Sequence, residues 1–416
     1  MLKRLLPYLV CFSAALFLAY ELIQLHMMNT IAVHMMKELN ITATTFGYIS
    51  STYLLADVLF LLPAGMILDR FSVRKVILSA MGICVVGTAL FASASSVTAL
   101  CLAHFLSGIG NAFCFLSCMI LVTRWFAPKM HATIMGSIVT IGMLGAFAAQ
   151  SPFNLVAQNL GWREALKIDV ILGLCILALI FFVVKENGEA TKQSKSPALL
   201  LSIKNAIQNP ITIKAGLYTG ILNLPLMIIS ATFGNLFLTQ IHHFSLDQAA
   251  FVTSMISMGT IFGSIAYGQL SDVFVDRKKL MVLGGVLSSI VMAMILTSPS
   301  SLAYLTLLFF LLGFITSSQV LGYPTIAQNS PEHLQGTSMG ISAVIIMGLP
   351  MFIQPLTGFI MDRLWSSQLL FNGTRLYPYE SFLYGFGMLP ILFLIGAYLI
   401  TTIASESKEK IAIQEA

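Results

Sequence analysis

Residues 65–75 read GMILDRFSVRK, a charged stretch that lies between two long apolar segments. A related stretch, GQLSDVFVDRKK, occupies residues 268–279. Three positions recur at one constant offset of 203 residues, so that Gly65, Asp69 and Arg74 correspond to Gly268, Asp272 and Arg277. Self-similarity at a fixed spacing is the signature of repeated units. The sequence therefore predicts two related halves.

The composition indicates the solvent that surrounds most of the chain. Hydrophobic residues make up 57% of the 416 residues, charged residues only 9%, and the mean hydropathy is +0.88. A soluble domain has about 25% charged residues. The apolar runs are longer than the roughly 10 residues of a spanning β-strand, and backbone in lipid must satisfy its own hydrogen bonds. We therefore predict an all-α membrane protein.

A search with a window of about 20 residues gives twelve predicted spans. They cover residues 8–34, 45–66, 76–96, 99–122, 133–158, 165–184, 211–240, 248–270, 280–298, 301–325, 335–361 and 381–403. A polar stretch separates the sixth span from the seventh. The predicted organisation is a six-helix bundle over residues 1–184, a linker over 185–209, a second six-helix bundle over 210–404 and a tail over 405–416.

Lysine and arginine lie mainly on one side of the predicted spans. Seventeen of the 22 lie on the side of the amino terminus and five lie on the other side. Because positively charged loops stay in the cytoplasm, both termini and both repeated loops are predicted to be cytoplasmic. The first apolar run lacks a cleavage-site pattern and is expected to remain as a span. The net charge of +5 then reflects this topology, and no nucleic-acid partner is expected.

The repeat extends into the fifth and eleventh spans. Gly145 and Pro152 in the fifth correspond to Gly348 and Pro355 in the eleventh, and a glutamine lies nearby in each, Gln150 and Gln354. Glycine and proline in a membrane helix allow close helix approach and bending. Bendable helices at matching places in two parallel halves are what a rocking transporter needs.

The repeated loop resembles the signature loop of the major facilitator superfamily. The matching positions are Gly65, Asp69, Arg70, Phe71, Arg74 and Lys75, and the degraded copy after the eighth span is typical of the family. Residues 104–110 and 161–163 fit the same family. The resemblance implies two six-helix bundles around a central cavity and alternating access for small solutes. The chain departs from the family at Ser72, which replaces glycine, at Val273, which replaces a basic residue, and at His104, which replaces arginine.

A narrower likeness concerns residues 125–162, which are similar to transporters of intracellular gamma-proteobacteria, including the phagosomal nutrient transporters. This resemblance implies a bacterial inner membrane and uptake of amino acids or nucleosides, whereas related proteins take up siderophores.

The signature loop is expected to act as a conformational gate. Asp69 can cap the positive end of a neighbouring helix and pair with Arg124 when the bundles close on the cytoplasmic side. The expected gate residues are Gly65, Asp69, Arg70, Arg74, Arg124, Asp272 and Arg277. The basic residues among them also satisfy the positive-inside rule without any gating role.

Few ionisable residues lie at membrane depth, and burying a charge there costs at least about 2.5–3.5 kcal/mol. Glu21 in the first span is the leading candidate for proton coupling, because in the family this span lines the cavity. Asp57 and His104 are further candidates, although each can also serve a structural hydrogen bond. For Asp169, a local ion pair with Arg163 or Lys167 is expected instead.

The expected solute contacts are neutral polar residues. They are Gln24 in the first span, Asn111 in the fourth, Gln150 in the fifth, Thr219 and Asn223 in the seventh, Gln319 and Tyr323 in the tenth, and Gln354 in the eleventh. Any one of them can equally join two helices. Without a buried arginine pair in the sequence pattern, a zwitterion, a neutral polar solute or a modest cation fits better than a dicarboxylate or a phosphate ester.

These patterns predict a monomeric secondary transporter, and no enzyme, because no nucleotide-binding loop, paired nucleophile and base, or metal cage is present. No cofactor is expected. Proton-coupled uptake of an organic nutrient is the main hypothesis, and efflux by proton antiport is an alternative. Siderophore or copper import is another, because residues 26–28 and 34–36 both read His-Met-Met, and thioether and imidazole ligands suit Cu(I). Methionine is also an ordinary filler of membrane cores.

Overall fold

The computed structural model describes residues 2–127, 130–185, 199–273, 277–331, 334–369 and 375–403. The side chains of Asp69 and Asp272 lie outside this description, as do most of the predicted linker and the predicted tail. Twelve helical segments in the described ranges are long and apolar enough to cross a membrane, which confirms the predicted number of spans.

The first half consists of seven helices that form six of these spans. They are α1 (Leu2–Leu39), α2 (Ala43–Arg70), α3 (Val73–Ser93), α4 (Val97–Trp125), α5 (His131–Ala148), α6 (Ser151–Leu160) and α7 (Trp162–Val183). The fifth span is divided between α5 and α6 just before Pro152, because a proline cannot donate the hydrogen bond that would continue the helix. The predicted bend in this span is therefore an interruption at Ala149 and Gln150.

The second half repeats this plan with more interruptions. After α8 (Leu199–Gln208), its elements are α9 (Pro210–Leu224), η2 (Pro225–Phe233), α10 (Gly234–Gln240), α11 (Leu246–Val273), α12 (Arg277–Leu296), α13 (Leu302–Thr316), η3 (Ser317–Leu321), α14 (Gly322–Gln328), α15 (Gln335–Arg363) and α16 (Tyr379–Thr401). The seventh span comprises α9, η2 and α10, and the tenth comprises α13, η3 and α14. Within the predicted linker, α8 is a short helix that contacts α15 and α9.

The loop that led to the repeat hypothesis is a tight helix-to-helix turn. The helix α2 ends at Arg70, Phe71 is extended, and α3 begins at Val73. Ser72 is the N-cap of α3, and its side chain accepts a hydrogen bond from the backbone N–H of Lys75 at 3.3 Å. Serine is among the preferred N-cap residues. The departure from glycine at this position therefore supplies a helix cap.

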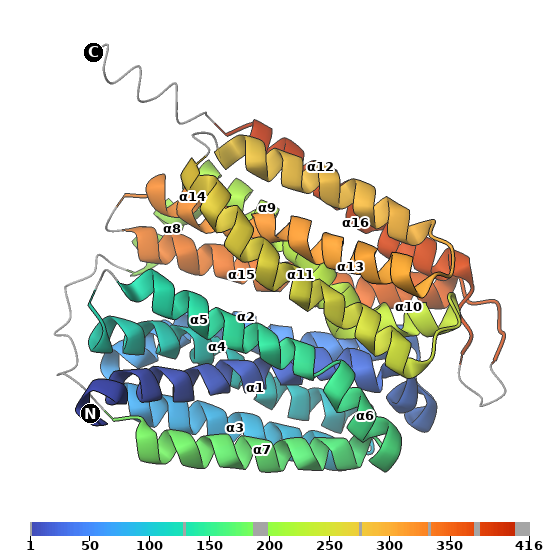
Figure 1. Ribbon diagram of the computed structural model, residues 1–416, viewed down its shortest axis with the longest axis horizontal. Helices are drawn as coiled ribbons and strands as arrows, with labels where there is room; N and C mark the ends of the chain where they lie inside the picture. The colour runs from blue at the N-terminus through green and yellow to red at the C-terminus, as the bar shows by residue number, and fades with distance from the viewer. Residues whose placement is uncertain are drawn as a thin grey trace.

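The two halves lie side by side with their helices along a common axis (Figure 1). We call the end that carries Arg70, Arg74 and Arg277 the basic end, and the end that carries Leu39 and Arg363 the distal end. The principal contacts between halves are made by α2 with α15 and by α1 with η2.

The hydrophobic core differs between these two ends. One buried cluster contains second-half residues together with first-half residues toward the distal end, such as Met28 and Phe46. Phe46 packs edge-on against Phe233 of η2, with ring centroids 5.8 Å apart. A separate cluster toward the basic end, which includes Val10 and Leu68, contains only first-half residues. The core is thus continuous across the halves at the distal end and divided at the basic end.

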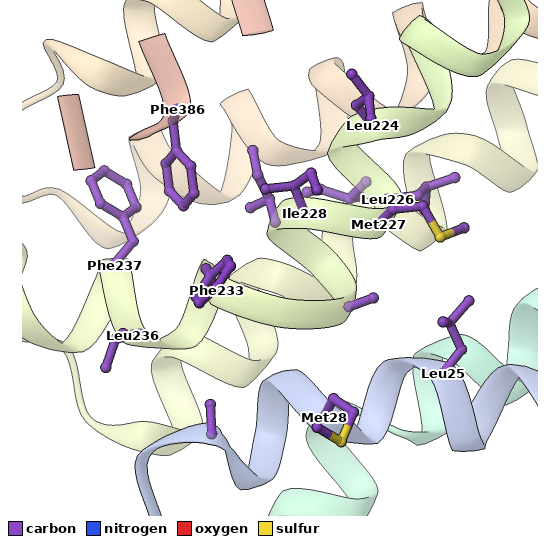
Figure 2. Packing of buried hydrophobic residues seen from close by; sticks show 14 of the residues in the cluster. Leu25, Met28, Leu224, Leu226, Met227, Ile228, Phe233, Leu236, Phe237 and Phe386 are labelled. Carbon is purple, nitrogen blue, oxygen red and sulfur yellow. The ribbon is translucent and has the colours of Figure 1, made fainter. Parts of the chain in front are cut away.

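The element η2 is a π-helix of nine residues, all of them buried. Such helices are rare and are frequently found at functional sites. Pro225 begins the element and has no N–H to donate. Figure 2 shows Met227 of η2 on the side of Leu25 of α1, whereas Ile228 lies on the opposite side of η2, toward Phe386. Apolar side chains therefore form part of the contact between α1 and η2.

Candidate functional site

Glu21 lies inside the first half rather than at the boundary with the second. Its Oε2 accepts a hydrogen bond of 2.8 Å from the Tyr53 hydroxyl, which donates from α2. Its Oε1 has no hydrogen-bond partner among the described residues. A Cβ added at Gly110 would lie 2.2 Å from this oxygen, so the glycine in α4 makes room for the carboxyl group. The expectation that Glu21 faces a cavity between the halves is corrected, because its side chain points into the first bundle.

His104 is connected to Glu21 through an aromatic ring. Its imidazole packs on Tyr53 with ring centroids 5.1 Å apart and on Phe91 at 5.3 Å. The side chain is fully buried, and neither ring nitrogen has a partner within the described part of the chain. Tyr53 therefore contacts both Glu21 and His104, two candidate residues that do not contact each other directly. Tyr53 was not predicted from the sequence, although its position one helical turn before Asp57 offered a signal.

Asp57 lies one helical turn after Tyr53 on α2, nearer the basic end, and is only 2% exposed. The Asn111 side chain of α4 lies beside its carboxyl group. Asn111 was expected to contact the solute, and the structure places it next to Asp57. Both residues lie within the first half, on α2 and α4.

A second polar chain surrounds Gln24. Its Nε2 donates to Oδ2 of Asp169 at 2.5 Å, and its Oε1 accepts from the Thr88 hydroxyl at 2.8 Å. The Tyr20 hydroxyl donates to Oγ1 of Thr88 at 3.5 Å. Gln24, like Glu21, therefore faces the interior of the first half. Neither Thr88 nor Tyr20 was singled out from the sequence.

The expected ion pair of Asp169 is wrong. Arg163 pairs with Glu38 at 2.9 Å, and Lys167 pairs with Glu164 at 2.6 Å. Asp169 is 3% exposed and faces Gln24. The two cations lie nearer the start of α7 and use surface partners, because Asp169 points toward α1 and α3.

The interior of the first half is therefore acidic. Three carboxyl groups are buried there, on Glu21, Asp57 and Asp169, whereas no lysine or arginine is buried among the described residues of the whole chain. An ionised carboxylate without a cation is costly in a medium that lacks water. These groups are thus suited to take up protons.

The two repeated glutamines occupy the boundary between the halves. Gln150 donates through Nε2 to the Ser230 carbonyl oxygen, and its Oε1 accepts from Thr253 at 3.2 Å. Gln354 donates through Nε2 to the Met227 carbonyl oxygen at 3.1 Å. Both glutamines therefore bind backbone carbonyls of η2, one from each half. Their bonds join helices and are not directed at an open space.

The candidates on the seventh and tenth spans differ in exposure. The Thr219 hydroxyl donates to the Gln319 carbonyl oxygen at 3.2 Å, and both residues are buried. Asn223 is 6% exposed, whereas Tyr323 on α14 is 40% exposed. Thr219 and Gln319 thus join α9 to η3, and Tyr323 presents an accessible aromatic side chain.

At the distal end, one carboxylate joins the two halves. Asp362 at the end of α15 accepts from the Thr44 backbone N–H at 2.8 Å and from the Thr44 hydroxyl at 2.5 Å, at the amino terminus of α2. Tyr377 donates its hydroxyl to Asp362 at 2.6 Å, and Arg375 lies 3.3 Å away. Burial and the bond to Asp362 raise the pKa of Tyr377, so its hydroxyl stays protonated and can donate. A carboxylate at a helix amino terminus is favoured by the helix dipole.

The backbones of α2 and α15 also approach most closely at this end. A Cβ at Gly358 would lie 2.3 Å from the Ala43 carbonyl oxygen, and one at Gly47 would lie 2.7 Å from the Gln354 carbonyl oxygen. At the basic end of α15, a Cβ at Gly336 would meet nothing within 4 Å. Between these two places, a Cβ at Gly340 would lie 3.6 Å from Cδ2 of Leu62, so α15 meets a side chain of α2 there and not its backbone.

The predicted gate residues at the basic end bond within their own halves. Arg74 donates to the Phe181 carbonyl oxygen at 2.7 Å, and Arg277 donates to Gln328 at 2.6 Å. Gly65 has open space around it, and Arg70 is exposed. The expected pair of Asp69 with Arg124 lies outside the description, because the Asp69 side chain is not described.

The family model described as the Major Facilitator Superfamily matches residues 11–355 and 217–415. The chain belongs to this superfamily. It is therefore a secondary transporter and a multi-pass membrane protein, and not an enzyme.

Among curated relatives, the probable galactarate/D-glucarate transporter GudP of Escherichia coli (strain K12) is 24% identical over 386 residues, which is 82% of this chain and 83% of that protein. Two solved structures share the fold. The D-xylose-proton symporter has a TM-score of 0.76 at 13% identity and covers 96% of this chain and 98% of its own. A mutant form of the nucleoside transporter NupG has the same TM-score and identity and covers 95% and 99%.

Proposed function

We propose that this transporter takes up a small polar organic solute, such as an amino acid or a nucleoside, together with protons across a bacterial inner membrane. The observation that carries the proposal is Glu21, a fully buried carboxyl group with one oxygen that has no partner in the described part of the chain. A buried carboxyl without a cation is more stable when protonated and can release its proton only when water or a cation reaches it. Such a group can couple a proton to a change of conformation.

The direction of access follows from charge and packing. If the basic end is cytoplasmic, as the positive-inside rule favours, the distal contacts close the outer side and the conformation is inward-facing. The expected role of the signature loop then belongs to the opposite conformation, in which Asp69 and Arg124 come together as the basic end closes. Gly65, Arg70, Arg74, Asp272 and Arg277 complete this proposed gate.

The class of solute is inferred from charge. Thr219, Asn223, Gln319 and Tyr323 are neutral, and no buried arginine or lysine among the described residues offers a partner for two carboxylates. A neutral or zwitterionic solute fits these neutral residues best. GudP is described as a galactarate/D-glucarate transporter, so these two dicarboxylates are the most informative competitors in a test.

The test is uptake into proteoliposomes of radiolabelled amino acids, nucleosides, galactarate and D-glucarate, with and without an imposed pH gradient. Glu21→Gln should abolish gradient-driven accumulation and preserve exchange of solute across the membrane, because the glutamine cannot ionise. The matched control is Glu164→Gln, since Glu164 is a carboxyl group on the surface, paired with Lys167.

Accumulation by the Glu21→Gln variant at the wild-type level would refute the role of Glu21. Accumulation only against the opposite gradient would indicate efflux by antiport. Accumulation of the dicarboxylates alone would overturn the solute class and leave proton coupling to be judged from Glu21→Gln.

A further inference from the structure

We infer that Asp169 is a second proton-binding carboxyl group, linked through Gln24 and Thr88 to Cys84, which borders Glu21. The inference deepens the proposed proton coupling and rests on it, because it adds a second group to the same process. It concerns a residue that the sequence placed in a surface ion pair.

Asp169 lies in the interior of the first half. It lies on α7, is 3% exposed and makes a 2.5 Å hydrogen bond with Nε2 of Gln24 on α1. Its position is about two helical turns inside the distal end of α7, which starts at Trp162. It is therefore nearer the distal end than Glu21, which precedes Gln24 by almost one turn of α1.

No described cation pairs with Asp169. Both nearby cations of α7 are engaged elsewhere, Arg163 with Glu38 and Lys167 with Glu164. The titratable side chains near Asp169 are Tyr20 and Glu21 on α1 and Cys84 on α3. None of these can be a cation. Asp169 thus shares the condition of Glu21: it is buried and faces no positive charge in the described part of the chain, so a proton stabilises it.

Hydrogen bonds lead from the Asp169 carboxyl group toward the Glu21 site. Gln24 binds Asp169 with one end of its amide and Thr88 with the other. The Cys84 carbonyl oxygen lies 3.0 Å from the Thr88 hydroxyl and competes with Gln24 for its single hydrogen. A Cβ at Gly110 would lie 3.0 Å from Cβ of Cys84 and 2.2 Å from Oε1 of Glu21, which shows that Cys84 borders the free oxygen of Glu21.

Protonation of Asp169 would reverse the donor and acceptor roles in this series of hydrogen bonds. When Asp169 is ionised, the Gln24 N–H donates to the carboxylate and Thr88 donates to the Gln24 oxygen. When Asp169 carries a proton, its O–H donates to the Gln24 oxygen, the amide turns over, and Gln24 donates to Thr88, whose hydrogen then remains for the Cys84 carbonyl. The protonation state of Asp169 is thereby transmitted to the wall of the Glu21 site.

The test uses the full-length protein in lipid nanodiscs and measures pH-difference infrared spectra, in which a protonated carboxyl group gives its own carbonyl band. Asp169→Asn should remove one band that titrates in the wild type, and Glu21→Gln should remove another. Gln24→Leu should move the Asp169 band, because the group loses its hydrogen bond. Glu164→Gln on the same helix is the control and should leave every buried-carboxyl band in place.

Transport provides the second readout. Asp169→Asn keeps an acceptor for Gln24 and should fold, yet gradient-driven accumulation should fall at least tenfold while exchange persists, and Asp169→Glu should restore part of it. Loss of no band in Asp169→Asn would overturn the inference, as would unchanged accumulation. If Glu21→Gln leaves accumulation unchanged but Asp169→Asn abolishes it, the proposed role of Glu21 fails and proton binding at Asp169 stands.

Discussion

The two ends of the boundary between the halves are built differently. At the distal end, backbone approach at Gly47 and Gly358, the carboxylate of Asp362 and a continuous core hold α2 and α15 together. At the basic end, Arg74 and Arg277 bond within their own halves and the space around Gly336 is open. Closure at the distal end therefore depends on fitted backbone contacts, which a single Cβ can prevent.

The largest expected effect comes from a clash. Gly358→Leu places a side chain where the Ala43 carbonyl oxygen would lie 2.3 Å from its Cβ. Overpacking of this kind costs about 1–3 kcal/mol or more, and about 3 kcal/mol would reduce the ratio of distal-closed to distal-open protein roughly 100-fold. The ratio can be measured by electron–electron spin resonance distances between labels at Leu160→Cys and His243→Cys in a Cys175→Ser background.

The control for this change is Gly336→Leu on the same helix, because nothing lies within 4 Å of its added Cβ. It should not lower the distal-closed fraction. Equal loss of that fraction in both variants would mean that α15 tolerates no leucine anywhere, and the contrast between the ends would be lost.

The next effect is electrostatic. Asp362→Ala removes the carboxylate that accepts from Thr44 at the start of α2 and from Tyr377. The loss of charge-assisted bonds at a helix amino terminus should cost about 2 kcal/mol, a roughly 30-fold fall in the distal-closed ratio. Asp362→Asn should fall between the two, since an amide oxygen still accepts. The same spin-label distances report the change, and an unchanged ratio in Asp362→Ala would show that the glycine contacts alone hold this end.

The two glutamines allow a sharper comparison between the halves. Gln150→Leu removes bonds to Ser230 and Thr253 across the boundary, whereas Gln354→Leu removes bonds to Met227 and Thr232 within the second half. A buried carbonyl left without its donor costs about 1–3 kcal/mol. Gln150→Leu should therefore lower the distal-closed ratio about tenfold, and Gln354→Leu should mainly lower thermal stability in detergent. The opposite assignment of these two effects would contradict the placement of Gln150 as the bridging residue.

The smallest effect is expected at the surface. Asn154 donates to Asp247 at 2.9 Å across the distal end, and Asp247 is exposed. Asn154 is itself buried, but the exposed Asp247 carboxylate can bind water in place of the lost donor. Asn154→Ala should therefore change the free energy of distal closure by only about 0.5 kcal/mol, a factor of two to three in the distal-closed ratio. A tenfold change in the same distance measurement would show that this pair matters as much as Gln150.

The sequence predicted the large features of the fold. The length of the apolar runs predicted twelve spans, and the repeat of Gly65 and Asp69 at Gly268 and Asp272 predicted two halves, because both signals lie along the chain. It did not predict how each helix is turned about its axis. The polar and apolar residues of the first span are not separated onto two faces, so nothing in its pattern showed that Glu21 and Gln24 face the interior of the first bundle.

The hydrogen-bond partners of the buried polar residues could not be predicted from the sequence either. Tyr53 reaches Glu21 across 32 residues, and Gln24 reaches Asp169 across 145. Such pairs form only when helices from distant parts of the chain are packed together, and Asp169 has nearer cations in the sequence that mislead. The candidates Glu21, Asp57 and His104 could be found because charge at membrane depth is rare, whereas tyrosine and threonine are common there.

The wide turns of η2 have one more consequence. A π-helix fits more residues into each turn than an α-helix does, so Pro225–Phe233 holds more chain in its length than an α-helix of the same length would hold. Rewinding these nine residues would lengthen the seventh span and rotate α10, drawing the Asn235 N–H away from the Asn29 oxygen that it now reaches at 2.8 Å. The seventh span therefore already contains the extra backbone length that a long-range movement would need.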